Sequence, residues 1–210
     1  MLIDELKNIA RNNGIVGAGG AGFPAYAKMT EKADTVILNC VECEPLLKLH
    51  RQLLATHTEE IIQMLDEVRE SFGAKEAVIG IKSEYVTTIK AIEEVIGDFP
   101  NVRICALKAA YPMGDEVVLI YEATGRVIKP GGLPIDENVV VYNVETMYNL
   151  YRAVHLNIPV TNKLVSIVGE IDHPLTVRVP LGTTVKEAIS LAGKITVEDP
   201  AYVMGGPMMG

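Results

Sequence analysis

The chain has 210 residues, of which 22% are charged, and a formal net charge of −8 at pH 7. This length predicts one or two globular domains, and the negative charge argues against non-specific nucleic-acid binding, which requires a positive face. The sequence also has no apolar run of the roughly 18 residues that a membrane span needs and no basic segment or cleavage site typical of a signal peptide. We therefore expect a cytoplasmic protein without direct membrane insertion.

The first three quarters of the sequence alternate between helical and strand patterns. In chain order, the spacing of apolar residues predicts a helix at 2–12, a strand at 35–39, a helix at 48–71, a strand at 77–81, a helix at 84–96, a strand at 102–107, a helix at 114–124, a strand at 139–143 and a helix at 145–156. This alternation is typical of a layered α/β domain with a largely parallel sheet and helices on both faces. We assign this domain to residues 1–160.

The pattern changes near residue 160. KLVSIVG and LTVRV predict two strands, GTTVKEAISLAG predicts a helix whose Thr184 and Glu187 have capping-box spacing, and AYVMGG predicts a third strand. This order is typical of a small ubiquitin-like β-grasp domain, which we assign to residues 161–210. Because the glycine-rich GGPMMG is an unusual natural terminus, we expect a truncated chain with an incomplete β-grasp domain.

A glycine-rich segment, GIVGAGGAGFPAYAK, occupies residues 14–28. It is not the dinucleotide fingerprint, which follows the first strand, nor a Walker A loop, which needs Gly-Lys-Ser/Thr. Bare backbone of this kind can line a concavity for a phosphate and let a flat ring approach closely, and Lys28 adds a point charge. The alternative is a flexible loop without a ligand. We favour binding, because glycines, Phe23, a proline and Lys28 lie in one short run.

Further polar motifs begin where predicted strands end. In parallel sheets, ligands bind at the carboxyl ends of the strands, which places NCVECEP (39–45) and YNVET (142–146) at one candidate site. Glu42 and Glu44 can hydrogen-bond a ring N–H or a ribose hydroxyl. The alternative is that they are solvated loop acids.

Two predicted helix starts carry polar groups as well. Asn143 and Thr146 open one helix, where side-chain donors and free amides can bind phosphate or simply cap the helix. YPMGDE places Gly114 before two acids at another helix start, where the helix dipole favours acids in any case. Each motif is weak alone, but together they converge on the same edge of the sheet.

The cysteines and histidines do not predict a metal centre. Three cysteines, an odd number, do not suggest a disulfide framework and cannot supply four thiolates to an iron–sulfur cluster. The four histidines lack His-x-x-x-His spacing. Cys40 and Cys43 form a Cys-x-x-Cys pair, but neighbouring acids would raise the thiol pKa, which argues against a redox dithiol.

Five motifs, GAGGAGFPAYAK, NCVECEP, AYPMGDE, GGLP and YNVETMYNLY, occur in the order and spacing of a known family. The sequence resembles the flavin-binding subunit of NADH-oxidising electron-transfer complexes, and most closely the RnfC-like branch. It is also similar to the cobalamin-reductase subunit of propanediol utilisation and the proline-reductase-associated electron carrier. The 51-kDa flavoprotein subunit of respiratory complex I is a more distant relative. The resemblance covers nearly the whole chain, and the tail is similar to the SLBB-type β-grasp domain of that family.

The resemblance implies a Rossmann-like domain that binds FMN, accepts hydride from NADH and passes electrons to iron–sulfur clusters of a larger Rnf-like complex. Because the flavin carries this chemistry, no catalytic side chain is needed. The 4Fe-4S clusters would be ligated by a missing C-terminal region. The implied partners are other subunits of a membrane-associated or cytosolic electron-transfer complex, which places the chain in the cytoplasm or peripherally on the cytoplasmic face of a membrane.

By motif, the resemblance also implies the ligand contacts. The FMN-binding residues would be Gly17, Gly19, Gly20, Gly22, Lys28, Asn39, Gly114, Glu116, Asn143 and Thr146. The NADH-binding residues would be Phe23, which would stack on the adenine, and Glu42 or Glu44, which would contact a ribose.

The sequence departs from the respiratory relatives at several of these motifs. Val41 replaces an Asp, Ala18 an Arg and Tyr142 an Asn, and residues 29–31 lack a second aromatic. We expect weaker retention of FMN and weaker stacking of NADH as a result. Two alternatives remain open: a noncatalytic scaffold module that uses the β-grasp domain, and a reductase partner of a corrinoid or selenoenzyme system.

Overall fold

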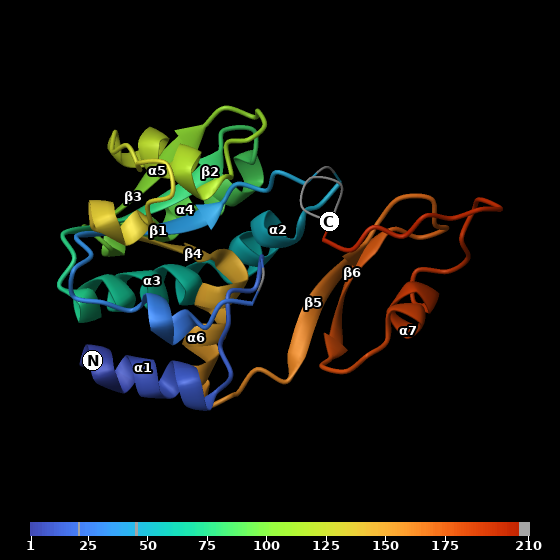
Figure 1. The fold of residues 1–210 in the computed structure, drawn as a ribbon, viewed down its shortest axis with the longest axis horizontal. Coiled ribbons are helices and arrows are strands. Elements are labelled where there is room, and N and C mark those ends of the chain that lie inside the picture. The colour runs from blue at the N-terminus through green and yellow to red at the C-terminus, as the bar shows by residue number, and fades with distance from the viewer. Residues whose placement is uncertain (21, 45, 206–210) are drawn as a thin grey trace. The chain divides into compact units, whose positions relative to one another are not determined.

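The computed structural model describes residues 1–20, 22–44 and 46–205 (Figure 1). The chain forms two compact units. The first comprises Met1–Cys43 and His50–Pro159, and the second comprises Glu44–Leu49 and the chain from Val160 onward.

The first unit is built on a four-stranded parallel sheet with the strand order β3-β2-β1-β4. The strands are β1 (Thr35–Cys40), β2 (Glu76–Lys82), β3 (Val102–Leu107) and β4 (Val139–Asn143). The two inner strands and β4 are almost wholly buried, as expected when helices cover both faces of a parallel sheet. The predicted α/β, Rossmann-like fold is therefore confirmed.

Helices cover the two faces of this sheet. They are α1 (Ile3–Asn12), α2 (Leu49–Thr56), α3 (Thr58–Phe72), α4 (Val86–Val95), α5 (Glu116–Thr124) and α6 (Val144–Leu156), with short 3-10 helices η1 (Ala25–Lys28), η2 (Ile96–Asp98) and η3 (Pro134–Glu137). Figure 1 shows α5 on one side of the sheet and α3 and α6 on the other. On the α5 side, Leu119 and Ile120 pack with Ile37, Val78 and Val141 into a buried cluster.

The prediction of a single helix at 48–71 is wrong, because the helix is interrupted at His57. The backbone of His57 is not helical (φ −126°, ψ 44°). The hydroxyl of Thr58 donates to the carbonyl of Leu54 at 2.7 Å, and that of Thr56 donates to the carbonyl of Gln52 at 2.8 Å. Such hydroxyls compete for the carbonyls of the preceding turn. The break leaves α2 as a separate helix that begins just after the loop following β1.

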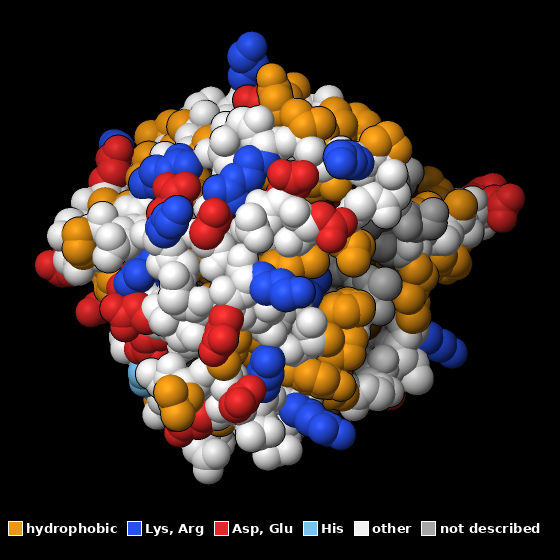
Figure 2. Space-filling view, turned by 60° about the vertical axis from the view of Figure 1, so that its left-hand side comes forward, with side chains coloured by type: hydrophobic (Ala, Val, Ile, Leu, Met, Phe, Trp, Pro, Cys, Tyr) orange, Lys and Arg blue, Asp and Glu red, His pale blue; other side chains and the backbone are white. Residues whose placement is uncertain are grey.

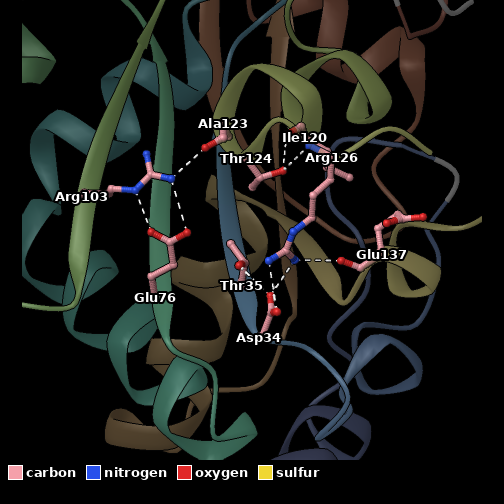
Figure 3. A network of polar contacts seen from close by, with 9 residues as sticks. All are labelled: Asp34, Thr35, Glu76, Arg103, Ile120, Ala123, Thr124, Arg126 and Glu137. Carbon is pink, nitrogen blue, oxygen red and sulfur yellow. Dashed lines mark hydrogen bonds and ion pairs between the residues drawn. The ribbon is translucent and has the colours of Figure 1, made fainter.

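Two arginines tie together the amino-terminal edge of the sheet, as Figure 3 shows. Arg126 pairs with both carboxylate oxygens of Asp34 and donates to the carbonyl of Glu137 at 2.8 Å. Arg103 pairs with Glu76 at 2.7 Å. These ion pairs lie at the amino-terminal ends of the strands, whereas the polar motifs lie at the carboxyl ends. We therefore assign the ion pairs a role in stability and not in binding.

The second unit contains an antiparallel pair, β5 (Asn162–Ile167) and β6 (Leu175–Pro180), followed by α7 (Val185–Ser190). The predicted capping box of α7 is confirmed, since Thr184 and Glu187 cap each other's backbone N–H groups. The strand predicted at 201–206 is wrong for residues 201–205, which form no strand, and residue 206 lies outside the described residues. The side chains of 202–204 are exposed, so no burial stabilises a strand there.

Within the part of the chain that the structure describes, every helix is too short or too polar to cross a bilayer.

Candidate functional site

The strand order defines a switch point between β1 and β4. From β1 the chain continues through β2 and β3 on one side and returns to β4 on the other. Asn39 near the end of β1 is the register partner of Asn143 at the end of β4. In open α/β sheets, ligands bind outside the carboxyl ends of the strands at such a point. The structure therefore brings together two of the residues that the sequence motifs singled out.

The glycine-rich loop is fastened to the first turn of α6. The hydroxyl of Thr146 accepts a hydrogen bond from the N–H of Ala18 at 2.9 Å and lies 3.3 Å from the carbonyl of Val16. Within the loop, the N–H of Gly17 donates to the carbonyl of Phe23 at 2.7 Å. The loop is thus held in place at the start of α6.

Gly19 lies directly against Asn143. A Cβ on Gly19 would lie 2.5 Å from Nδ2 of Asn143 and 3.5 Å from Cε1 of His50, whereas a Cβ on Gly20 would meet nothing within 4 Å. Asn143 caps α6, because its Oδ1 accepts from the N–H of Glu145 at 2.9 Å. Only a residue without a side chain allows this close approach, and the bare backbone of Gly20 faces open space.

Lys28 and Glu116 are direct partners. The ammonium of Lys28 lies 3.3 Å from Oε1 of Glu116 and 3.4 Å from the carbonyl of Val141 in β4. Both side chains remain more than one third exposed. The pair therefore sets a positive and a negative group side by side at the sheet edge, within reach of solvent.

Two hydrogen bonds hold Gly114 against the end of β1 and the loop that follows it. Its carbonyl accepts from Nδ2 of Asn39 at 2.9 Å, and its N–H donates to Sγ of Cys43 at 3.1 Å. A Cβ on Gly114 would lie 1.9 Å from the carbonyl oxygen of Val41. Asp115 caps α5 by accepting from two backbone N–H groups, so this helix begins at Glu116 rather than at 114 as the sequence predicted.

Glu42 is buried rather than presented to solvent, with a side chain only 4% exposed. Its Oε1 accepts from the N–H of His50 at 2.9 Å, and its Oε2 has no hydrogen-bond partner among the described residues. Burial raises the pKa of this carboxyl, and the bond from His50 and the charge of Arg51 offset the rise in part. The side chain supports the start of α2, and its predicted ribose contact stays a prediction.

We expect Glu42→Gln to raise the free energy of unfolding at neutral pH by about 1 kcal/mol, because it removes a buried negative charge that Arg51, 3.9 Å from Oε2, compensates only in part, and keeps an acceptor for His50. The folded-state pKa lies above the unfolded value of about 4.3, so the folded state binds more protons. Wild-type stability should therefore fall as the pH rises from about 4.3 through the folded-state pKa. Urea unfolding across this range measures both effects.

The control for this variant is Glu93→Gln, at an exposed position of α4. It should leave both the stability and its pH dependence close to wild type. A Glu42→Gln variant that is less stable than wild type at every pH would show that the charged carboxylate is the favoured form.

The structure gives less information on how the remaining predicted residues relate to the carboxyl ends of the strands. The side chain of Phe23 is 53% exposed, and Gly22 adopts φ +73°, where glycine is favoured. Glu44 falls in the second unit, so its proximity to the others stays a prediction. On the face drawn in Figure 2, Lys and Arg side chains are interspersed with Asp and Glu. An anion would thus depend on local groups such as Lys28.

The cysteines contribute no cluster of ligands. All three are free thiols, and burial, followed by the charge of Glu42, raises the pKa of the Cys40 thiol well above its usual range. Among the described residues, no group of three or more His, Cys, Asp or Glu side chains is placed to hold a metal ion.

His50 is a residue of this edge that sequence reasoning missed. Its Nε2 lies 2.9 Å from Nδ2 of Asn143. The sequence carried one usable signal, since His50 follows the NCVECEP motif at the start of a helix that leaves the end of β1. It belongs to no motif, however, and the spacing of the histidines bears only on metal ligation.

Comparisons with known proteins agree with this geometry. The family model of the Nuo51 FMN-binding domain matches residues 10–152, and that of the SLBB domain matches residues 164–210. The chain is 41% identical over 207 residues to cobalamin reductase PduS of Salmonella typhimurium, which covers 99% of this chain and 46% of the relative. It is 32% identical over 212 residues to one subunit of the Na(+)-translocating ferredoxin:NAD(+) oxidoreductase complex of Acetobacterium woodii, covering 99% of this chain and 48% of the relative.

A solved structure has the same fold. The NAD+-reducing NiFe-hydrogenase in the H2-reduced state aligns with a TM-score of 0.75 at 22% identity, over 90% of this chain and 39% of that one. The chain spans about half the length of the curated relatives that it matches. Because the Nuo51 model covers more than half of the sequence and the resemblance drawn from the motifs agrees with it, the chain belongs to the Nuo51 FMN-binding domain family.

Proposed function

We propose that this chain is the FMN- and NADH-binding part of an oxidoreductase subunit that passes electrons to iron–sulfur clusters elsewhere in its complex. The observation that carries the proposal is the convergence of the glycine-rich loop, the end of β1 and the start of α6 at the switch point of the sheet. Bound FMN would supply the conversion of a two-electron hydride into single electrons.

The residues at this edge fit a flat anionic ligand. Open space above Gly20 and Gly22 leaves room against bare backbone. The start of α6 favours negative charge, and Lys28 supplies a cation in a chain whose overall charge is −8. We assign the phosphate and ribityl end to the glycine loop, Lys28, Asn143 and Thr146, and the ring edge to Asn39, Gly114 and Glu116.

The other components of the proposal concern NADH and partners. Phe23 is exposed and available to stack on the adenine, and Glu42 or Glu44 would contact a ribose. The iron–sulfur clusters would lie elsewhere in the complex, and the partners would be other subunits of an electron-transfer complex, either cytoplasmic or peripheral on a membrane. The 41% identity to a cobalamin reductase favours a corrinoid system as a second candidate acceptor.

A flavin titration tests the proposal. We expect the 210-residue chain to bind FMN saturably and the flavin's visible absorbance to bleach when NADH is added anaerobically. In Lys28→Ala, the FMN affinity should fall about tenfold, because one charge-assisted contact is lost. Fluorescence quenching gives the affinities, and absorbance follows the reduction.

The matched control is Lys32→Ala, which removes an exposed lysine four residues away and should bind FMN like wild type. Equal affinities in the two variants would remove Lys28 from the site. A wild-type chain that binds no FMN would favour the scaffold alternative. FMN binding without bleaching would support the flavin site but contradict hydride transfer from NADH.

A further inference from the structure

His50 joins the three segments that meet at the switch point. It is the second residue of α2, and its ring lies against the side-chain amide of Asn143. Nε2 lies 2.9 Å and Nδ1 3.4 Å from Nδ2 of Asn143. The intervening Cε1 lies 3.5 Å from the position that a Cβ on Gly19 would take. The imidazole therefore lies beside the glycine loop and the end of β4 at once.

The orientation of the Asn143 amide determines which group donates in this contact. Its Oδ1 accepts from the N–H of Glu145 as the cap of α6, so its NH₂ end faces His50. An NH₂ group can only donate, so the Asn143 amide directs an N–H toward the ring of His50. A primary amide carries two N–H donors. His50 takes one, which leaves the second for a ligand.

His50 itself is held from the opposite side. Its backbone N–H donates to Oε1 of Glu42, whose side chain is buried and begins two residues beyond the end of β1. The residue is thus fixed to the β1 loop through its backbone and to the cap of α6 through its ring. This leaves the Asn143 amide a single orientation, with its NH₂ beside Gly19 at the N-terminus of the 13-residue helix α6.

We propose that His50 is a positioning residue for the phosphate of FMN: it holds the Asn143 amide so that the phosphate meets a donor already fixed in place. The inference rests on the proposed FMN function. A donor that is fixed before binding loses less conformational entropy than one that must be ordered by the ligand. Riboflavin, which has the same ring and ribityl chain without the phosphate, should gain nothing from this arrangement.

The test compares FMN and riboflavin affinities, measured by fluorescence titration of the 210-residue chain. His50→Leu, which keeps bulk but removes the acceptor, should weaken FMN binding about fivefold to tenfold and leave riboflavin binding within about twofold. His50→Gln, which restores an acceptor, should recover most of the loss. The control is His155→Ala at the other end of α6, where the ring contacts Glu67, and it should match wild type.

A double-mutant cycle makes the assignment specific. Asn143→Ser can still cap α6 but has no NH₂ group, so it should show the same FMN-selective loss, and adding His50→Leu should cost nothing further. This variant also decides the question if His50→Leu does not fold. Equal losses for FMN and riboflavin, unchanged FMN affinity or additive losses would overturn the inference while leaving the proposed function intact. A wild-type chain that binds neither flavin would overturn both.

Discussion

Gly114→Ala is expected to lower the free energy of unfolding by about 3 kcal/mol, at the upper end of what overpacking usually costs, and to abolish tight FMN binding. A Cβ at this position would lie 1.9 Å from the carbonyl oxygen of Val41 and 2.8 Å from Sγ of Cys43. A backbone oxygen cannot rotate away as a side chain can. The loop must therefore lift from the end of β1 and break the hydrogen bonds of Gly114 to Asn39 and Cys43.

Urea unfolding and FMN titration of the same samples measure this effect. The matched control is Gly97→Ala in η2, where a new Cβ would meet nothing within 4 Å; it should leave both quantities close to wild type. A Gly114→Ala variant with wild-type stability would mean that the loop at 111–115 lies farther from β1 than the structure places it.

The fold of the first unit could be predicted from the sequence, because the residues that make up the apolar pattern are the ones that are buried. The two inner strands and β4 contain continuous apolar runs, and the helices between the strands carry apolar faces, so their alternation predicted a parallel sheet. The prediction failed where side-chain hydrogen bonding overrides periodicity. Thr56 and Thr58 bond back to carbonyls of α2, and the regular apolar spacing of 48–71 gave no sign that the helix breaks at His57.

The candidate site could be predicted in part, since the carboxyl ends of parallel strands share one edge. That rule predicts that Asn39 and Asn143 lie together, and they are register partners. It could not reveal contacts across large separations in sequence, such as Lys28 with Glu116 or His50 with Asn143. Nor could it reveal that Glu42 turns inward to the start of α2, because the sequence pattern of a loop acid is the same whether the acid is buried or solvated.

Gly19→Ala is expected to lower the free energy of unfolding by about 2 kcal/mol, because it combines overpacking with damage to a helix cap. The new Cβ would lie 2.5 Å from Nδ2 and 3.2 Å from Cγ of Asn143. The Asn143 side chain is short and already bonded to the N–H of Glu145, so it can yield only by giving up the cap. Hydrogen exchange should then show faster opening of the first turn of α6, alongside the loss of stability in urea.

Gly20→Ala isolates this effect, because it makes the same change one residue later in the same loop, where the new Cβ meets nothing within 4 Å. Both variants reduce the flexibility of the unfolded chain equally, so the difference between them reports only the contact with Asn143. If both lose the same stability, the loop needs glycine for its backbone and not for its approach to Asn143. A loss confined to Gly19→Ala, with α6 opening at its start, would establish that the glycine loop and the cap of α6 fold as one unit, as the placement of a ligand between them requires.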